Sequence, residues 1–211
     1  MVPKVNFIWS WIYQSQIHST TVDEEYDYES YTRYVESFIK GIKKTWKALE
    51  ENVFRSIEEL SGLKWGKSEL NCYVIKISSM NPISDPMTIP IQLQAEGGNF
   101  TLSEERFIDM VVHELIHNLF IQNEDKMNQY FKYALRKYKN EQLNTIIHLF
   151  LHAIQKKIFL KLFDKRRLNN EKQACSFYDA DKKSWDMVDK IGEDIIIQEF
   201  IEMAGLPREN A

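Results

Sequence analysis

The segment Val111-Val112-His113-Glu114-Leu115-Ile116-His117 decides how this chain is interpreted. Its two histidines are four residues apart, so on an α-helix they lie on the same face, one turn from each other. Imidazoles placed in this way can bind one cation at about 2.0–2.1 Å. Glu114 follows His113 directly and therefore lies close to that cation without sharing the ligand face. A general base that acts on a metal-activated water has to stand there.

The residues around the motif are apolar on nearly every side of the predicted helix. They are Met110, Val111, Leu115, Ile116, Leu119 and Phe120. A helix of this kind is expected in the core. Burying a carboxylate and two imidazoles there is costly unless a metal or hydrogen bonds satisfy them. The alternative interpretation is two core histidines bonded to backbone groups, with Glu114 paired to a Lys or Arg side chain.

A second histidine pair strengthens the metal interpretation. The sequence has 5 histidines, and His148 and His152 are again four residues apart, in an apolar run from Asn144 to Ile154. We therefore expect a second buried helix that carries both rings on one face. This helix is predicted to supply a third ligand, which leaves a fourth position open for water, as a catalytic zinc requires.

On these residues the chain resembles the zincin metallopeptidases, which carry the H-E-x-x-H motif. Metzincins have a glycine where this chain has Phe120, so the resemblance is to the gluzincins, whose third ligand comes from a separate downstream helix. It covers residues 103–155 and carries over His113, Glu114 and His117. It implies Zn²⁺ as cofactor, peptide-bond hydrolysis with Glu114 as the general base, and a peptide or protein substrate.

The third ligand departs from the gluzincin pattern, which normally has a glutamate. We predict His148 as the ligand and keep His152 as the alternative. His152 also has the spacing at which gluzincins carry an acidic residue that orients a zinc-bound histidine. Glu141 is the carboxylate candidate and shares the same helix face. Tyr178 and His18 are candidate donors to the oxyanion, but no motif marks them, so neither is assigned.

Two other functions remain open besides the zinc metallopeptidase. The same water chemistry would serve a zinc hydrolase that acts on a non-peptide amide or ester. The other function is that of a catalytically inactive, metal-stabilised regulatory protein, in which Glu114→Gln would change only stability.

Composition limits the broader classes. A chain of 211 residues with 44% hydrophobic and 27% charged residues fits a single globular domain over residues 1–211. A net charge of −4 argues against nucleic-acid binding. Two cysteines, Cys72 and Cys175, make no disulfide framework, and the apolar segment Val5–Tyr13 is too short to cross a membrane. We therefore expect a cytoplasmic protein; its oligomeric state is not predicted.

The expected fold class is α+β, with a small, mostly antiparallel sheet followed by a helical bundle that carries the motif helix. Residues 1–100 form the strand and long-helix part, and residues 101–211 form the helical part with the metal site. Strands are predicted at Val5–Ile12, Leu70–Ser78 and Ile89–Gln94, with a helix between the first two that ends at Gly62.

The third of these strands is predicted at the sheet edge because it contains Pro90, and there it could pair with an extended substrate. Thr101-Leu102-Ser103-Glu104 fits a capping box that starts the motif helix. Further helices are predicted at residues 125–138, 141–163, 182–191 and 193–203, with a loop over residues 169–181.

Overall fold

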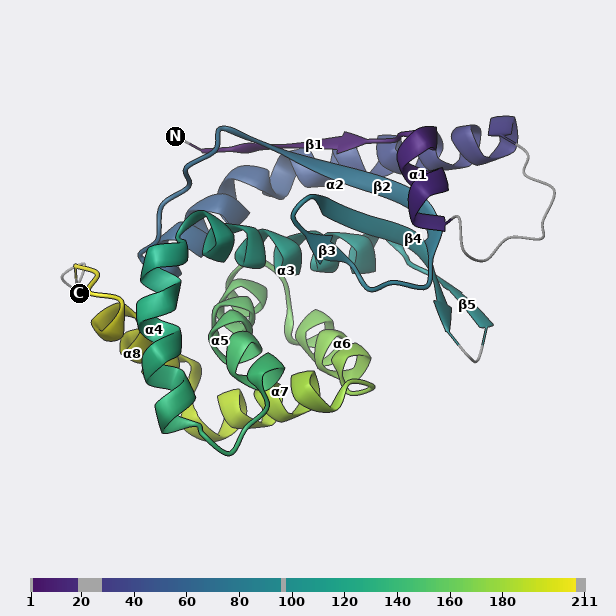
Figure 1. Ribbon diagram of the computed structural model, residues 1–211. Helices are drawn as coiled ribbons and strands as arrows, with labels where there is room; N and C mark the ends of the chain where they lie inside the picture. Colours follow the sequence, from purple (N-terminus) through teal and green to yellow (C-terminus); the bar gives the residue numbers. More distant parts are fainter. Residues whose placement is uncertain (1, 19–27, 96–97, 208–211) are drawn as a thin grey trace. The chain divides into compact units, whose positions relative to one another are not determined.

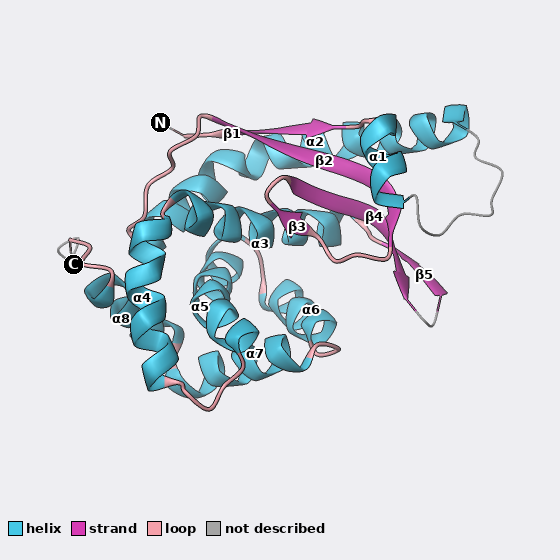
Figure 2. Cartoon of the chain, in the orientation of Figure 1, coloured by secondary structure: helices cyan, strands magenta, loops and turns pink. Residues whose placement is uncertain are grey.

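The computed structural model describes residues 2–18, 28–95 and 98–207, and the elements below belong to this part of the chain (Figures 1 and 2). Its strands are β1 (Lys4–Ile8), β2 (Glu69–Ser78), β3 (Ile83–Ser84), β4 (Met87–Ala95) and β5 (Gly98–Thr101). Its helices are α1 (Trp11–His18), α2 (Tyr28–Ser61), α3 (Glu104–Gln122), α4 (Glu124–Lys137), α5 (Leu143–Leu162), α6 (Lys165–Cys175), α7 (Asp179–Ile191) and α8 (Glu193–Met203). The α+β class is confirmed.

The chain forms two compact units. The sheet unit comprises Met1–Glu51 and Lys67–Asn118, and the helical unit comprises Asn52–Gly66 and Leu119–Ala211. The sequence of α2 and that of α3 each contribute to both units. A single domain over residues 1–211 stays a prediction.

The sheet is mixed rather than mostly antiparallel, so that part of the prediction is wrong. The strand order is β1-β2-β4-β3, with β5 also paired to β4. The pairs β1/β2 and β2/β4 are parallel, whereas β3/β4 and β4/β5 are antiparallel. Parallel neighbouring strands need a crossover connection, which is usually a helix. The segment between β1 and β2 contains such a helix, α2. Hydrophobic alternation marks a strand but carries no information on its direction.

The segment Ile89–Gln94 is also not at the sheet edge. It lies in β4, which pairs with β2 on one side and with two short strands on the other. β3 pairs at Met87 and Thr88, and β5 pairs from Gln92 to Ala95. A strand of two residues is too short to give a periodic pattern, which is why β3 was not predicted.

The first predicted strand is shorter than expected because a serine starts a helix after it. Ser10 Oγ accepts a hydrogen bond from Tyr13 N at 3.3 Å, and Ser10 O accepts one from Gln14 N at 2.9 Å. Ser10 is therefore the N-cap of α1, which begins at Trp11. The buried Gln14 side chain then bonds to β2: its Oε1 accepts from Lys76 N at 2.6 Å, and its Nε2 donates to Ile77 O at 3.2 Å.

The predicted long helix is confirmed as α2. Its apolar stripe is buried, and in the sheet unit Trp46 packs edge-to-face on Phe7 of β1 with ring centroids 6.2 Å apart. The helix stops at Gly62, whose φ of 69° is left-handed and favours glycine. Val35, Ile42, Val53 and Ile57 are fully buried along the stripe.

The helical unit is organised around α5, which packs against α4, α6, α7 and α8 (Figure 1). Neighbours on several sides explain why its sequence is apolar nearly all round. Phe150 of α5 stacks on Phe120 and Phe200, with ring centroids 5.2 Å and 3.8 Å from its own.

The predicted loop over residues 169–181 is wrong, because α6 and the start of α7 lie there. Asp164 caps α6, accepting a hydrogen bond from Arg167 N at 2.8 Å. Only Leu168, Glu171 and Cys175 are buried in α6, so the segment gives little hydrophobic signal.

Candidate metal centre

Helix α3 carries the motif, and its start is set by a serine. Ser103 Oγ accepts a hydrogen bond from Arg106 N at 3.1 Å, and Ser103 O accepts one from Phe107 N at 2.9 Å. The cap is therefore Ser103; Thr101, which would cap the predicted box, belongs to β5. The apolar residues around the motif, Val111, Val112, Leu115 and Ile116, have no exposed surface, as a core helix requires.

His113 and His117 differ from these neighbours because both are only partly buried. Their ring centroids lie 5.0 Å apart and their planes make an angle of 66°. The spacing of four residues therefore places the two imidazoles next to each other, on a part of the helix that keeps some access to solvent. A metal site needs this access for entry of the ion and of a substrate.

Glu114 lies on the buried side of α3, with 6% of its surface exposed. Ser84 Oγ of β3 donates a hydrogen bond of 2.6 Å to Glu114 Oε2. Burial raises the pKa of Glu114 to about 7, and the Ser84 hydrogen bond opposes this rise. In the described part of the chain the carboxylate thus bonds to a hydroxyl, not to the Lys or Arg side chain of the alternative interpretation.

Asn118 bonds to the same short strand as Glu114. Its Nδ2 donates to Ser84 O at 2.8 Å, and it is buried. Since Glu114 and Asn118 are four residues apart, they share one face of α3. The same turn of helix that carries the candidate base is therefore fixed to both the side chain and the backbone of Ser84.

His148 lies in the first half of α5 and is half-buried. Its Nδ1 lies 2.8 Å from Asn144 O and 3.4 Å from Asp181 Oδ1 of α7. Both neighbours are acceptors, so the proton belongs on Nδ1 and the lone pair on Nε2 is left for a cation. Burial raises the pKa of Asp181, and the His148 ring opposes this rise.

His152 is fully buried and has a different environment. Its Nδ1 forms a hydrogen bond of 2.9 Å with Ser184 Oγ, and its ring stacks on Trp185 with centroids 4.2 Å apart. Glu141, the carboxylate candidate, lies 3.6 Å from Lys183 Nζ in an ion pair. Tyr178 precedes α7 and is half-exposed, while the side chain of His18 lies outside the described part of the structure.

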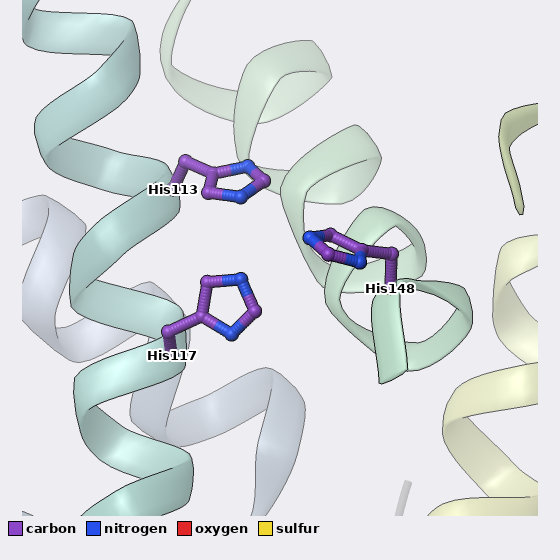
Figure 3. A group of neighbouring side chains, drawn as sticks. All are labelled: His113, His117 and His148. Atoms are coloured by element: carbon purple, nitrogen blue, oxygen red, sulfur yellow. The ribbon is translucent and has the colours of Figure 1, made fainter. Parts of the chain in front are cut away.

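Three of the predicted ligands come together. His113, His117 and His148 each offer one ring nitrogen, and these nitrogens all lie within 4.8 Å of one another. Figure 3 shows the three rings pointing toward one another, two from α3 and one from α5. His152 and Glu141 are not part of this group.

The group fits a metal ion in its chemistry. Tetrahedral zinc with bonds of about 2.0–2.1 Å sets its ligand nitrogens about 3.3 Å apart. The limit of 4.8 Å, within which the three ring nitrogens lie, includes that spacing. Three imidazoles suit zinc, and they also suit copper, iron and nickel, so the donors alone do not name the metal.

Comparison of the chain with protein-family models, with curated proteins and with solved structures finds no match. None of the helices in the described residues combines the length and the apolar character needed to cross a membrane. A cavity of about 370 Å³ is lined by β1 and α2, including Asn6, Lys43 and Glu50, and no histidine lines it. The histidine group and its surroundings are therefore the features of the described residues that bear on function.

Sequence reasoning missed Ser84, Asp181 and Ser184, the partners of Glu114, His148 and His152. Each partner is a common polar residue outside any motif, and each lies on another element from the residue that it contacts. No local pattern marks such a contact.

Proposed function

We propose that the chain is a zinc-dependent metallopeptidase. The observation that carries the proposal is the group of His113, His117 and His148. Glu114 follows His113, the first of these residues, directly in the sequence. Three protein ligands with one open position are the usual set of a catalytic zinc, whereas structural zinc sites are closed by four.

Zinc in such a site lowers the pKa of a bound water towards about 7 and polarises a carbonyl group. Glu114 is the residue that would take the proton from the attacking water. Its Oε2 accepts the hydrogen bond from Ser84, so Oε1 is the oxygen left for that proton. Glu114 would then deliver the proton to the leaving amine, so that it acts first as base and then as acid.

A zinc hydrolase acting on a smaller amide or ester is the second candidate, and one observation favours it. The strand Ile89–Gln94, which at a sheet edge could have paired with an extended peptide, is an interior strand. A small substrate needs no such edge, whereas a peptide substrate would need another surface on which to lie.

A non-catalytic, metal-stabilised protein is the third candidate. It is favoured by the burial of Glu114 and by its short bond to Ser84, because such a bond between β3 and α3 is sufficient by itself to account for a buried carboxylate as a structural residue. Under this interpretation the histidines bind a metal but no bond is cleaved.

Metal content tests the site itself. We would purify the wild-type chain and the variants His113→Ala, His117→Ala and His148→Ala without chelators, add zinc, and measure bound metal by elemental analysis. Leu160→Ala is the control, because it changes an exposed residue of α5 that lies outside the group. The expected result is one zinc ion per chain in the wild type and the control, and loss in the other three. A wild-type chain without zinc would overturn the proposal.

Activity separates the three functions. We would incubate the zinc-loaded chain with a diverse peptide mixture and with simple amides and esters, and identify products by mass spectrometry. Peptide cleavage that disappears in Glu114→Gln, with zinc retained, supports the peptidase. Products from the small substrates alone support the second candidate. No product from either set, with zinc bound, supports the third.

A further inference from the structure

Two acceptors lie next to Nδ1 of His148, and they are of different kinds. One is the backbone carbonyl of Asn144, 2.8 Å away and one turn earlier on α5. The other is the Asp181 carboxylate on α7, 3.4 Å away. The side chains of His148 and Asp181 are only 18% and 21% exposed, so water screens this pair less than it screens a surface pair.

Contacts on both sides fix the position of Asp181 on α7. One residue earlier, Ala180 O accepts a hydrogen bond of 3.2 Å from Thr145 Oγ1 of α5. Three and four residues later, Ser184 bonds to His152 and Trp185 stacks on the same ring. The first two turns of α7 are therefore held against the face of α5 that carries His148, and packing rather than chance places the carboxylate there.

We propose that Asp181 is a positioning residue for His148 as a metal ligand. The inference rests on the proposed metal site. The Asn144 carbonyl already favours the proton on Nδ1. Asp181 adds a negative charge on the same side of the ring. This charge makes the lone pair of Nε2 a stronger ligand for a metal ion, and the contact holds the orientation of the ring. Carboxylates that contact the far nitrogen of a metal-bound histidine typically contribute 10–100-fold to metal affinity.

A competing role for Asp181 would be purely structural. It lies in the first turn of α7 together with Asp179, where a negative charge stabilises the helix through its dipole. That role predicts that replacing either aspartate lowers the stability of the metal-free protein and leaves zinc affinity unchanged.

Asp181→Asn tests the proposal because asparagine keeps the size and one acceptor oxygen but removes the charge. Asp179→Asn is the matched control, since it removes a charge from the same helical turn at an exposed position. We would measure zinc affinity of each full-length chain by competition with a chromophoric chelator, and thermal unfolding of each metal-free chain. We expect zinc affinity to fall about 10-fold or more in Asp181→Asn and to stay unchanged in Asp179→Asn.

Three results would overturn the inference or its basis. Equal zinc affinity of Asp181→Asn and wild type shows that Asp181 has no part in metal binding. An equal loss in both variants shows an effect of helix stability. If the wild-type chain takes up no zinc at all, the proposed metal site is wrong, and this outcome is distinct from the first two because they require zinc binding by the wild type.

Discussion

Ser84 and Glu114 are 30 positions apart in the chain, yet Ser84 Oγ donates a hydrogen bond of 2.6 Å to Glu114 Oε2. The bond joins a two-residue strand to the motif helix, next to the first predicted metal ligand. It engages one carboxylate oxygen of Glu114 and restricts the rotamers of the whole side chain. The candidate base is therefore held in place before any substrate arrives, which is how a catalytic group gains from pre-organisation.

The Ser84→Ala variant should separate the support of Glu114 from metal binding. Removing the hydroxyl leaves a buried carboxylate without its donor, so we expect a loss of about 1–3 kcal/mol in the free energy of unfolding. Bound zinc should be unchanged, because Ser84 is not a ligand. Urea unfolding and elemental analysis measure the two quantities. Unaltered stability would show that solvent replaces the serine without cost.

The pH dependence of the metal-free protein should reveal the burial of Glu114. Its pKa is raised from 4.5 to about 7, so the neutral form favours folding. The stability that comes from this neutral form is complete below about pH 4.5 and is lost as the pH rises through about 7. Glu114→Gln stays neutral and should become more stable than the wild type from pH 5 to pH 8, by a difference on the order of a few kcal/mol. Parallel stability curves of the two chelator-treated proteins would contradict this.

Phe150→Ala should be among the most destabilising single changes in the helical unit. Phe150 has no exposed surface and stacks on Phe120 and Phe200. Truncation leaves a cavity in the centre of the unit, and such changes cost about 3–5 kcal/mol. Leu160→Ala, at a residue of α5 that is 42% exposed, is the control and should cost much less. Similar unfolding free energies for both variants would mean that the cavity collapses.

Zinc should stabilise the folded chain through its binding to the native state. At a free zinc concentration 100 times the dissociation constant, the expected gain is about 2.7 kcal/mol, and a strong chelator should reverse it. Thermal unfolding with zinc and with chelator measures the difference. His148→Ala should abolish the gain, and Leu160→Ala, at an exposed position of α5, should keep it. A gain that persists in His148→Ala would point to zinc bound elsewhere.

Most of the correct predictions from the sequence come from helical periodicity. The spacing of His113 and His117 places their rings together on α3, and the apolar runs predict the burial of α3 and α5 correctly. Local signals failed where the structure depends on contacts between elements. α6 is mostly polar, so it gave too weak a pattern for a helix, and β3 has only two residues.

The surroundings of the site were less predictable than the motif for the same reason. Whether His148 or His152 joins His113 and His117 depends on which side of α5 meets which neighbour, and both histidines lie on the same apolar run. Trp185 and Ser184 enclose His152. Asp181 and a backbone carbonyl stand behind His148 instead. These differences arise from the packing of α7 on α5, which no spacing within α5 encodes.

The shortness of β3 limits how a peptide could be held beside Glu114. Strand β3 ends the order of the sheet and pairs through Ile83 and Ser84 alone, and Ser84 O already accepts from Asn118. A peptide laid along this rim would find main-chain partners over two residues at most. A peptidase built in this way would select its substrates by the side chains next to the scissile bond, and it would gain little from a longer extended chain.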